Sequence, residues 1–391
     1  MTLRFAPFSI DAPQSALDDL HERLERTRFP EQLPDAGWDY GTELEYLRRL
    51  LAYWRDDYDW RATEARLNGF QQFTTEIDGA RIHFLHVRSP EPDALPIVIT
   101  HGWPGSIVEF LDVIGPLSNP RAFGGDAADA FHVVVPSLPG YGFSGPTRER
   151  GWHPMRVARA WVQLMAGLGY SRYTAQGGDW GSFVTLQVAA ADPAHCVGVH
   201  VNFLPSIPST DDHTDEEREF LADAARYNDD DSGYFKEQST KPQTIGYALE
   251  DSPAGLAAWV VEKFRTWTDR NGDVEDHFTK DQLLDNLMLY WLTGTAHSSA
   301  RMYYEFVHGL MDGSIDLTAS VGSHRLTDVG VPVPVGYARY PNEIMRTSRR
   351  WAAAQYNIVH FVDMPRGGHF AAFEVPGLFV DDVRAWGRHV R

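Results

Sequence analysis

The chain contains almost no cysteine: Cys196 is the one cysteine in 391 residues. A single thiol cannot form an internal disulfide, which fits a reducing compartment such as the cytoplasm. Residues 1–15 lack the basic segment and the apolar run of a signal peptide. No apolar run approaches the ~18 residues of a membrane-spanning helix. We therefore expect a soluble, cytoplasmic protein with no membrane partner.

Positive charge is also scarce. The chain has 35 lysine and arginine residues against 54 aspartate and glutamate residues, a formal net charge of −19. Nucleic acids and anionic membrane surfaces bind through basic surfaces, so neither is an expected partner. Hydrophobic residues are abundant, at 43% with 12 Trp, 16 Tyr and 21 Phe. A chain of this length and composition can bury a large core and carry insertions.

The order of the predicted elements indicates an α/β fold. Apolar residues at helical spacing predict amphipathic helices at 14–28 and 42–58, and Asp78-Gly79 centres a predicted hairpin at 73–86. Short apolar segments then alternate with helical ones, which is typical of an open, mostly parallel sheet. The predicted strands are 95–100, 131–135, 171–176, 196–203, 331–335 and 357–362, and the helices between them include 155–168 and 183–191.

The alternation is interrupted once. Residues 206–312 are rich in helix formers, acids and aromatics and show no series of strands. The simplest arrangement is one α/β domain with a helical insertion over the edge of the sheet. We divide the chain into an N-terminal helical meander that wraps the core (1–80), a first core segment (81–205), a helical cap (206–312) and a second core segment (313–391). Ligands in such folds bind at the carboxyl ends of the strands.

The segment Gly177-Gly178-Asp179-Trp180-Gly181-Ser182 lies between a predicted strand and a predicted helix. It matches the G-x-S-x-G pattern of a nucleophile elbow, with Asp179 in the place of the serine. The glycines suit a strained turn in which the helix packs close to the strand. An aspartate at such a junction is most often only the N-cap of the helix. The segment alone thus leaves two interpretations of Asp179, a nucleophile and a helix cap.

A nucleophile on such an elbow needs an orienting acid and then a histidine later in the chain. His369 lies in a glycine-rich turn, Pro365-Arg-Gly-Gly-His-Phe370, after the last predicted strand, and is the candidate base. Glu343 follows the preceding strand and is the candidate acid. Asp363 is its rival, although its place at the end of the last strand better suits a role in the turn. The alternatives are a surface histidine for His369 and an exposed loop carboxylate or helix cap for Glu343.

Two backbone amides complete the predicted site. The loop His101-Gly-Trp-Pro-Gly-Ser106 occupies the position that contributes one amide of an oxyanion hole, and the residue after the nucleophile contributes the other. These amides belong to Trp103 and Trp180. A carboxylate attacks an sp³ carbon without a base and becomes an ester. His369 would then activate a water molecule to attack the carbonyl carbon of that ester. The pattern predicts displacement at carbon, with no cofactor or metal.

The motifs HGWPGS, GGDWGS and RGGHFAAFE, with the N-terminal helical meander, resemble those of epoxide hydrolases of the microsomal type. The resemblance runs nearly the whole length and includes 239–264 of the predicted cap. It implies an α/β-hydrolase fold with a helical cap. It also implies that the nucleophile, acid and base are Asp179, Glu343 and His369.

The resemblance further implies two cap tyrosines, Tyr234 and Tyr303, that donate hydrogen bonds to the epoxide oxygen, with Tyr304 as the alternative to Tyr303. An alkoxide is a poor leaving group unless an acid protonates it, and a phenol with a pKa of about 10 stays protonated at neutral pH. The aromatic cap favours a small apolar or aromatic epoxide as the substrate. Membrane-bound relatives carry an N-terminal anchor, which this chain does not show, so we do not expect membrane attachment. A homodimer is plausible from the resemblance, and the oligomeric state stays open.

Two other functions remain as alternatives. Haloalkane dehalogenases share the fold, the aspartate nucleophile and the following tryptophan. They commonly hold the halide with a further Trp or Asn, and halide departure does not require acidic tyrosines. A non-catalytic ligand-binding protein is the second alternative, against which the intact candidates Asp179, Glu343 and His369 argue.

Overall fold

The computed structural model describes residues 3–206, 212–268, 272–315 and 331–391. Within these ranges one nine-stranded sheet has the order β1-β2-β3-β5-β4-β6-β7-β8-β9. Strands β4 to β9 pair in parallel, and β1 to β3 form an antiparallel edge. The predicted mostly parallel α/β sheet is therefore confirmed. The strands are β1 (Ala6–Phe8), β2 (Gln72–Ile77), β3 (Ala80–Val87), β4 (Leu95–Thr100), β5 (Phe131–Pro136), β6 (Tyr173–Gly177), β7 (Cys196–Val201), β8 (Val335–Arg339) and β9 (Ile358–Asp363).

Most strands lie where the sequence predicts them, and the hairpin shows why. Ile77 pairs with Ala80, and the two residues between them have positive φ angles, 51° at Asp78 and 76° at Gly79. An Asp-Gly pair suits this tight turn. The prediction of a strand over 331–335 is wrong, because β8 begins only at Val335. The preceding prolines carry no N–H for a sheet ladder. The short strand β1 was not predicted.

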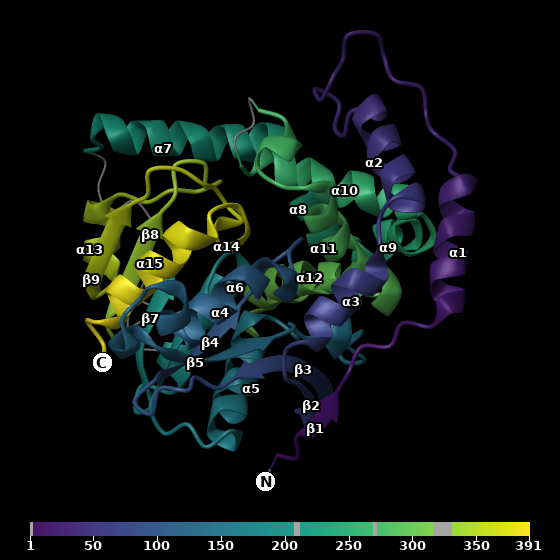
Figure 1. The fold of residues 1–391 in the computed structure, drawn as a ribbon. Helices are drawn as coiled ribbons and strands as arrows, with labels where there is room; N and C mark the ends of the chain where they lie inside the picture. Colours follow the sequence, from purple (N-terminus) through teal and green to yellow (C-terminus); the bar gives the residue numbers. More distant parts are fainter. Residues whose placement is uncertain (1–2, 207–211, 269–271, 316–330) are drawn as a thin grey trace.

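Helices surround the sheet and fill the long interruption (Figure 1). Helix α3 was not predicted, whereas α1, α2, α5 and α6 lie close to their predicted ranges. The helices are α1 (Gln14–Glu25), α2 (Leu44–Asp56), α3 (Trp60–Asn68), α4 (Leu111–Ser118), α5 (Pro154–Gly167), α6 (Trp180–Ala191), α7 (Asp215–Arg226), α8 (Gly233–Thr240), α9 (Pro242–Asp251), α10 (Pro253–Thr266), α11 (Lys280–Thr293), α12 (Ala296–Asp312), α13 (Arg349–Gln355), α14 (Ala371–Glu374) and α15 (Pro376–Gly387).

In its described residues, the segment between β7 and β8 holds helices α7 to α12 and no strand. Figure 1 shows α7 to α11 in the upper half of the view and strands β1 to β7 below them. Residues 207–211 and 269–271 of the predicted cap, and 316–330 of the predicted second core segment, lie outside the described residues. The described helices of this segment meet the loops at the strand ends, because Tyr234 of α8 stacks on Trp103 and Tyr303 of α12 contacts Trp180.

The N-terminal helices brace this helical layer as well as the core. Helices α1 and α2 pack against α10, and α2 and α3 pack against α11. Asp285 of α11 is buried and its Oδ1 accepts hydrogen bonds from Tyr58 Oη at 2.7 Å and Thr63 Oγ1 at 2.5 Å. Arg23 of α1 forms an ion pair with Asp251 at 2.9 Å. These polar contacts join the N-terminal segment to the helical layer formed by α7 to α12.

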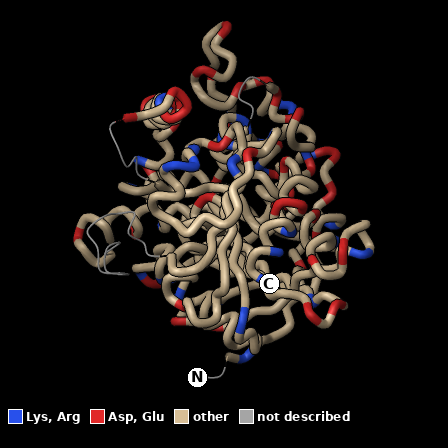
Figure 2. The backbone as a smooth tube through the Cα atoms, turned by 90° about the vertical axis from the view of Figure 1, so that its left-hand side faces the viewer, with Lys and Arg blue, Asp and Glu red and all other residues tan. Residues whose placement is uncertain are grey.

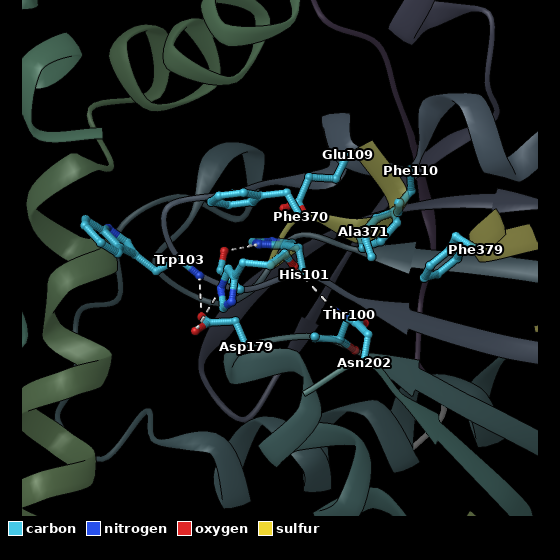
Figure 3. Close-up of a pocket in the computed structure, with 15 residues that line it drawn as sticks. Thr100, His101, Trp103, Glu109, Phe110, Asp179, Asn202, Phe370, Ala371 and Phe379 are labelled. Carbon is cyan, nitrogen blue, oxygen red and sulfur yellow. Dashed lines mark hydrogen bonds and ion pairs between the residues drawn. The ribbon is translucent and has the colours of Figure 1, made fainter. Parts of the chain in front are cut away.

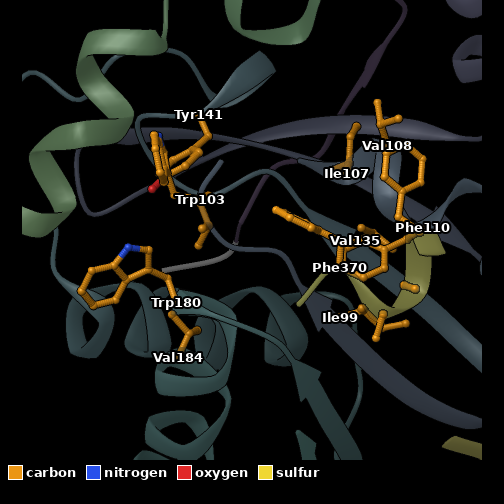
Figure 4. Close-up of a cluster of buried hydrophobic side chains, with 14 of the residues drawn as sticks. Ile99, Trp103, Ile107, Val108, Phe110, Val135, Tyr141, Trp180, Val184 and Phe370 are labelled. Atoms are coloured by element: carbon orange, nitrogen blue, oxygen red, sulfur yellow. The ribbon is translucent and has the colours of Figure 1, made fainter. Parts of the chain in front are cut away.

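Buried apolar side chains gather where the central strands end. Figure 4 shows Ile99 from β4 and Val135 from β5 grouped with Ile107 and Phe370, and Val184 from α6 beside Trp180. Apart from Trp180, these residues are at most 2% exposed. Close packing of this kind leaves little freedom for the loops that leave β4 and β6. The core thus forms a rigid base for those loops.

The surface carries the excess negative charge. Figure 2 shows aspartate and glutamate residues around the whole periphery of the backbone tube, with lysine and arginine interspersed. Cys196 is buried. No helix in the described ranges combines the length and apolar character that crossing a bilayer would demand.

Candidate active site

Asp179 occupies a strained turn between β6 and α6. Its backbone has φ 50° and ψ −128°, a conformation that side chains other than glycine rarely adopt. Such strain costs about 1–3 kcal/mol and persists only where the surroundings enforce it. The side chain makes no capping hydrogen bond to the helix. The helix-cap interpretation of Asp179 therefore finds no support in the geometry.

Glycines allow this turn to form. A Cβ on Gly181 would lie 2.0 Å from the carbonyl oxygen of Thr100, and one on Gly177 would lie 2.2 Å from the carbonyl oxygen of Gly181. A Cβ on Gly102, in the loop after β4, would lie 2.2 Å from Asp179 Oδ1. Real Cβ atoms do not approach so closely. The three glycines let the two loops and α6 close around the carboxylate.

The amide of Trp103 donates a hydrogen bond to Asp179 Oδ1 over 2.8 Å (Figure 3). His101 holds that loop, because its Nδ1 bonds the carbonyl of Gly102 at 3.0 Å and its Nε2 accepts from the amide of Leu138 at 3.1 Å. Burial lowers the pKa of His101 to about 4, so the ring is neutral and can make both bonds. Trp180 is the first residue of α6, directly after Asp179. Of the two predicted amides, the described contacts give a bond to the carboxylate for Trp103 alone.

His369 lies on the other side of the carboxylate. Its Nε2 is 3.5 Å from Asp179 Oδ2, and its Nδ1 is 2.6 Å from Glu343 Oε1. The backbone amide of His369 donates to the carbonyl of Trp267 at 2.9 Å, which fixes the glycine-rich turn under the helical layer. Burial opposes the charged imidazolium, but the carboxylates of Glu343 and Asp179 outweigh it. The pKa of His369 is therefore raised well above its usual value.

Glu343 and its rival Asp363 have different surroundings. The Glu343 side chain is fully buried, and its Oε1 also accepts from the amide of Ile344 at 2.7 Å. Asp363 is 62% exposed and pairs with Arg339 of β8. The structure thus brings Glu343, and not Asp363, to His369.

The two cap tyrosines face the same place from different helices. The ring of Tyr234, from α8, stacks on Trp103 with centroids 5.0 Å apart and planes at 6°. Tyr303, from α12, meets Trp180 edge-on at 4.8 Å and Tyr234 at 5.9 Å. Burial raises the pKa of both phenols well above 10, so both keep their protons. Tyr304 points elsewhere, since it is only partly buried and stacks on His308 at 3.8 Å.

Comparison with known proteins assigns the chain to a family. Residues 5–110 match the model "Epoxide hydrolase N terminus", and residues 96–244 match "alpha/beta hydrolase fold". A "Putative epoxide hydrolase" of Stigmatella aurantiaca is 48% identical over 98% of this chain and 85% of its own length. "Epoxide hydrolase 1" of Sus scrofa is 36% identical over 97% and 87%. The juvenile hormone epoxide hydrolase of Bombyx mori superposes with a TM-score of 0.89 at 31% identity, covering 99% and 95% of the two chains.

This chain belongs to the epoxide hydrolase family. The predicted α/β-hydrolase fold is confirmed by the family model and by the superposition. The prediction of an epoxide hydrolase family enzyme is confirmed as well, because the relatives match over almost the whole chain. Neither alternative drawn from the sequence gains support from these comparisons.

The candidate site also contains residues that were not predicted from the sequence. Glu109 is buried beside Asp179 and His369, where burial raises its pKa to about 8. Its Oε1 accepts from the amide of Ser106 at 3.0 Å and completes a capping box. The S-x-x-E spacing of Ser106 and Glu109 carried that signal. Tyr227, whose hydroxyl lies 2.6 Å from that of Tyr234, had no comparable signal.

A cavity of about 20 Å³ lies among these groups. Asp179, His369, Glu109, Asn202 and Trp103 contribute to its lining, and Figure 3 shows several of its side chains directed inward. This volume suffices for a water molecule that has polar partners. Among the described residues, no group of three or more His, Cys, Asp or Glu side chains could hold a metal ion. The arrangement offers a carboxylate, an imidazole, an amide donor and a polar chamber next to them.

Proposed function

We propose that this enzyme hydrolyses an epoxide to a vicinal diol through a covalent ester on Asp179. The observation that carries the proposal is the strained position of Asp179, with its oxygens at the Trp103 amide and near the imidazole of His369. Membership of the epoxide hydrolase family supports the substrate class. The four segments predicted from the sequence keep their roles in this proposal, with 206–312 as the cap over the site.

In the first step, Asp179 attacks one carbon of the epoxide ring. A new C–O bond forms to the carboxylate while the ring C–O bond breaks and its electron pair moves to the epoxide oxygen. Tyr234 and Tyr303 donate hydrogen bonds to that oxygen, and one phenol supplies the proton that makes it a hydroxyl. Their buried and protonated state suits them to this task.

Ester formation changes the electrostatics of His369. In the resting site two carboxylates raise the pKa of His369, and one of them loses its charge when Asp179 becomes an ester. The pKa of His369 then falls, so the imidazolium releases its proton, which returns to the phenolate left by the first step, and the neutral imidazole can act as a base. The loss of that charge thus converts a charged partner of Asp179 into the base for the second step.

In the second step, His369 takes a proton from water, and the resulting hydroxide attacks the carbonyl carbon of the Asp179 ester. The cavity beside Asp179 and His369 has room for this water. The amide of Trp103, with that of Trp180, stabilises the oxyanion that forms. Glu343 orients the imidazole and stabilises its charged form. The intermediate collapses to the Asp179 carboxylate and the diol.

The rings around the tyrosines favour an apolar or aromatic epoxide. Trp103, Trp180, Phe235 and Phe306 lie in contact with Tyr234 or Tyr303 or with each other. Apolar ligands gain binding free energy from burial against such surfaces. Whether the enzyme works as a homodimer is testable by light scattering.

A single turnover in ¹⁸O-labelled water tests the covalent route. With enzyme in excess over a model aryl epoxide, the oxygen first delivered to the diol should come from Asp179 and carry no label. The peptide that contains Asp179 should then carry one ¹⁸O, and an Asp179→Ala variant should give no diol. Label found in the diol of the first turnover would show direct attack by water and overturn the proposal.

A further inference from the structure

The hydroxyl of Tyr234 has a partner that the proposed chemistry does not use. Tyr227 Oη lies 2.6 Å from Tyr234 Oη, a short hydrogen bond in which either oxygen can donate. Tyr227 begins a π-helical turn, η5 (Tyr227–Asp231), between α7 and α8. π-Helical turns inside helices are often found at functional sites. The two phenols therefore lie at a local irregularity of the helical layer.

The phenol pair runs from the buried site toward solvent. Tyr234 is 5% exposed, whereas Tyr227 is only partly buried and the residues that follow it, Asn228 to Asp230, are exposed. Burial raises the pKa of both phenols, and the hydrogen bond from Tyr234 acts in the opposite direction on Tyr227. Negative charge is therefore better tolerated on Tyr227 than on Tyr234.

Tyr303 lacks such support. Its hydroxyl is buried and has no hydrogen-bond partner among the described residues. The edges and faces of Trp103, Trp180 and Phe235 surround its ring. An apolar surrounding penalises a charged oxygen that receives no hydrogen bond. A phenolate on Tyr303 would therefore be costly, although its neutral hydroxyl can still donate to a ligand.

A buried cation lies beside Tyr234. The Nζ atom of Lys263 is 4.9 Å from the centroid of the Tyr234 ring, and the residue is 3% exposed. Its charge is shared with Asp231 at 2.7 Å and Glu262 at 2.9 Å. Asp179 opposes negative charge on Tyr234 in the resting site, and this opposition ends when Asp179 becomes an ester. Asp231 still opposes negative charge on both phenols, and Lys263 offsets part of that opposition through its ion pair with Asp231.

We propose that Tyr227 and Tyr234 form a proton relay, in which Tyr234 protonates the epoxide oxygen and is itself reprotonated by Tyr227. The relay rests on the proposed function. As Asp179 bonds to carbon and the ring C–O bond breaks, one proton moves from Tyr234 to the oxygen and a second moves from Tyr227 to Tyr234. Tyr227 becomes the phenolate and regains a proton from solvent or from His369. Tyr227 is thus a positioning residue that acts through Tyr234, and Tyr303 only orients the oxygen.

The test follows ester formation in single turnovers of a model aryl epoxide, read by the fluorescence of the tryptophans beside Asp179. Tyr227→Phe should slow ester formation about tenfold, the effect of losing one functional hydrogen bond. Ester hydrolysis should keep its rate. Tyr53→Phe is the matched control, because it removes a phenol that bonds Asp281 at 2.8 Å on the surface. That control should keep both rates.

The number of protons that move during ester formation distinguishes a relay from a purely structural role of Tyr227. In mixtures of H₂O and D₂O, two moving protons make the rate of ester formation curve with the deuterium fraction, and one makes it fall linearly. The wild type and Tyr303→Phe should give a curve, and Tyr227→Phe a straight line. A straight line for the wild type, or a curve for Tyr227→Phe, overturns the relay even if diol forms normally. A wild type that forms no diol overturns the proposed function and the relay together.

Discussion

Replacing Glu343 by glutamine removes one charge next to His369 and little else. Glu343 Oε1 lies 2.6 Å from His369 Nδ1, with both side chains buried. At an effective dielectric constant of about 20, opposite unit charges at that separation attract by at most about 6 kcal/mol. Glutamine keeps a hydrogen-bond acceptor, so the loss should approach the ~1.5–3 kcal/mol of a charged hydrogen bond. We expect ester hydrolysis to slow roughly 10- to 150-fold.

The effect should be confined to the second step. Asp179 needs no base to attack the epoxide, so ester formation in Glu343→Gln should stay close to that of the wild type. Rapid mixing with excess epoxide should therefore give a full burst of the covalent ester on Asp179, followed by slow steady-state release of diol. Because Glu343 raises the pKa of His369, its loss lowers that pKa. The acidic limb of the pH–rate profile for ester hydrolysis should move to lower pH.

Asp363→Asn is the matched control, since Asp363 pairs with Arg339 at the surface and does not contact His369. Its kcat should equal that of the wild type. A Glu343→Gln variant in which ester formation slows as much as ester hydrolysis would refute the assignment of Glu343 to the base. Unchanged turnover in Glu343→Gln with loss in Asp363→Asn would assign the acid to Asp363.

Three further predictions concern the same site. Asp179→Ala should fold and bind ligand but form no diol, and full activity in a product assay would refute the nucleophile. Gly102→Ala should lower kcat about a hundredfold, because its Cβ would lie 2.2 Å from Asp179 Oδ1, whereas Gly377→Ala, with nothing within 4 Å, should be neutral in the same assay. Burial raises the pKa of Glu109 from 4.5 to about 8. The folded protein therefore loses stability as the pH rises across that interval, because Glu109 ionises more readily in the unfolded chain. The melting temperature of Glu109→Gln should therefore gain on the wild type between about pH 5 and 8, and a pH-independent difference would contradict the burial argument.

The local signals in the sequence were strongest where glycine and turn chemistry leave few conformations. The Asp78-Gly79 hairpin and the elbow at Asp179 both adopt positive φ angles at the predicted residues. The start of β8 was misplaced because its apolar alternation outweighed the missing N–H groups of the two prolines before Val335. Helix α3 and strand β1 escaped prediction because they are nine and three residues long and hold few periods of any pattern.

The candidate site divides in the same way. Asp179, Glu343 and His369 follow strands, and the carboxyl ends of parallel strands meet at one edge of a sheet, so chain order predicts their meeting. No comparable rule predicts which side chains of α7 to α12 reach the site. Tyr303 and Tyr304 are neighbours on α12, and only the packing of that helix turns Tyr303 to Trp180 and Tyr304 to His308. Tyr227 enters the site through a contact that no local pattern specifies, whereas Glu109 belongs to the capping box that the S-x-x-E spacing marks.

The sequence by itself predicted the class of chemistry: an elbow motif holds Asp179, and the candidate acid Glu343 and base His369 follow later strands in the expected order. Those signals are local because each concerns a turn whose backbone must fit a tight space. The tertiary structure decided which phenols face Asp179, which carboxylate touches His369, and that Tyr227 bonds Tyr234. Such pairings join segments whose relative positions depend on packing across the whole molecule, which short sequence patterns do not encode.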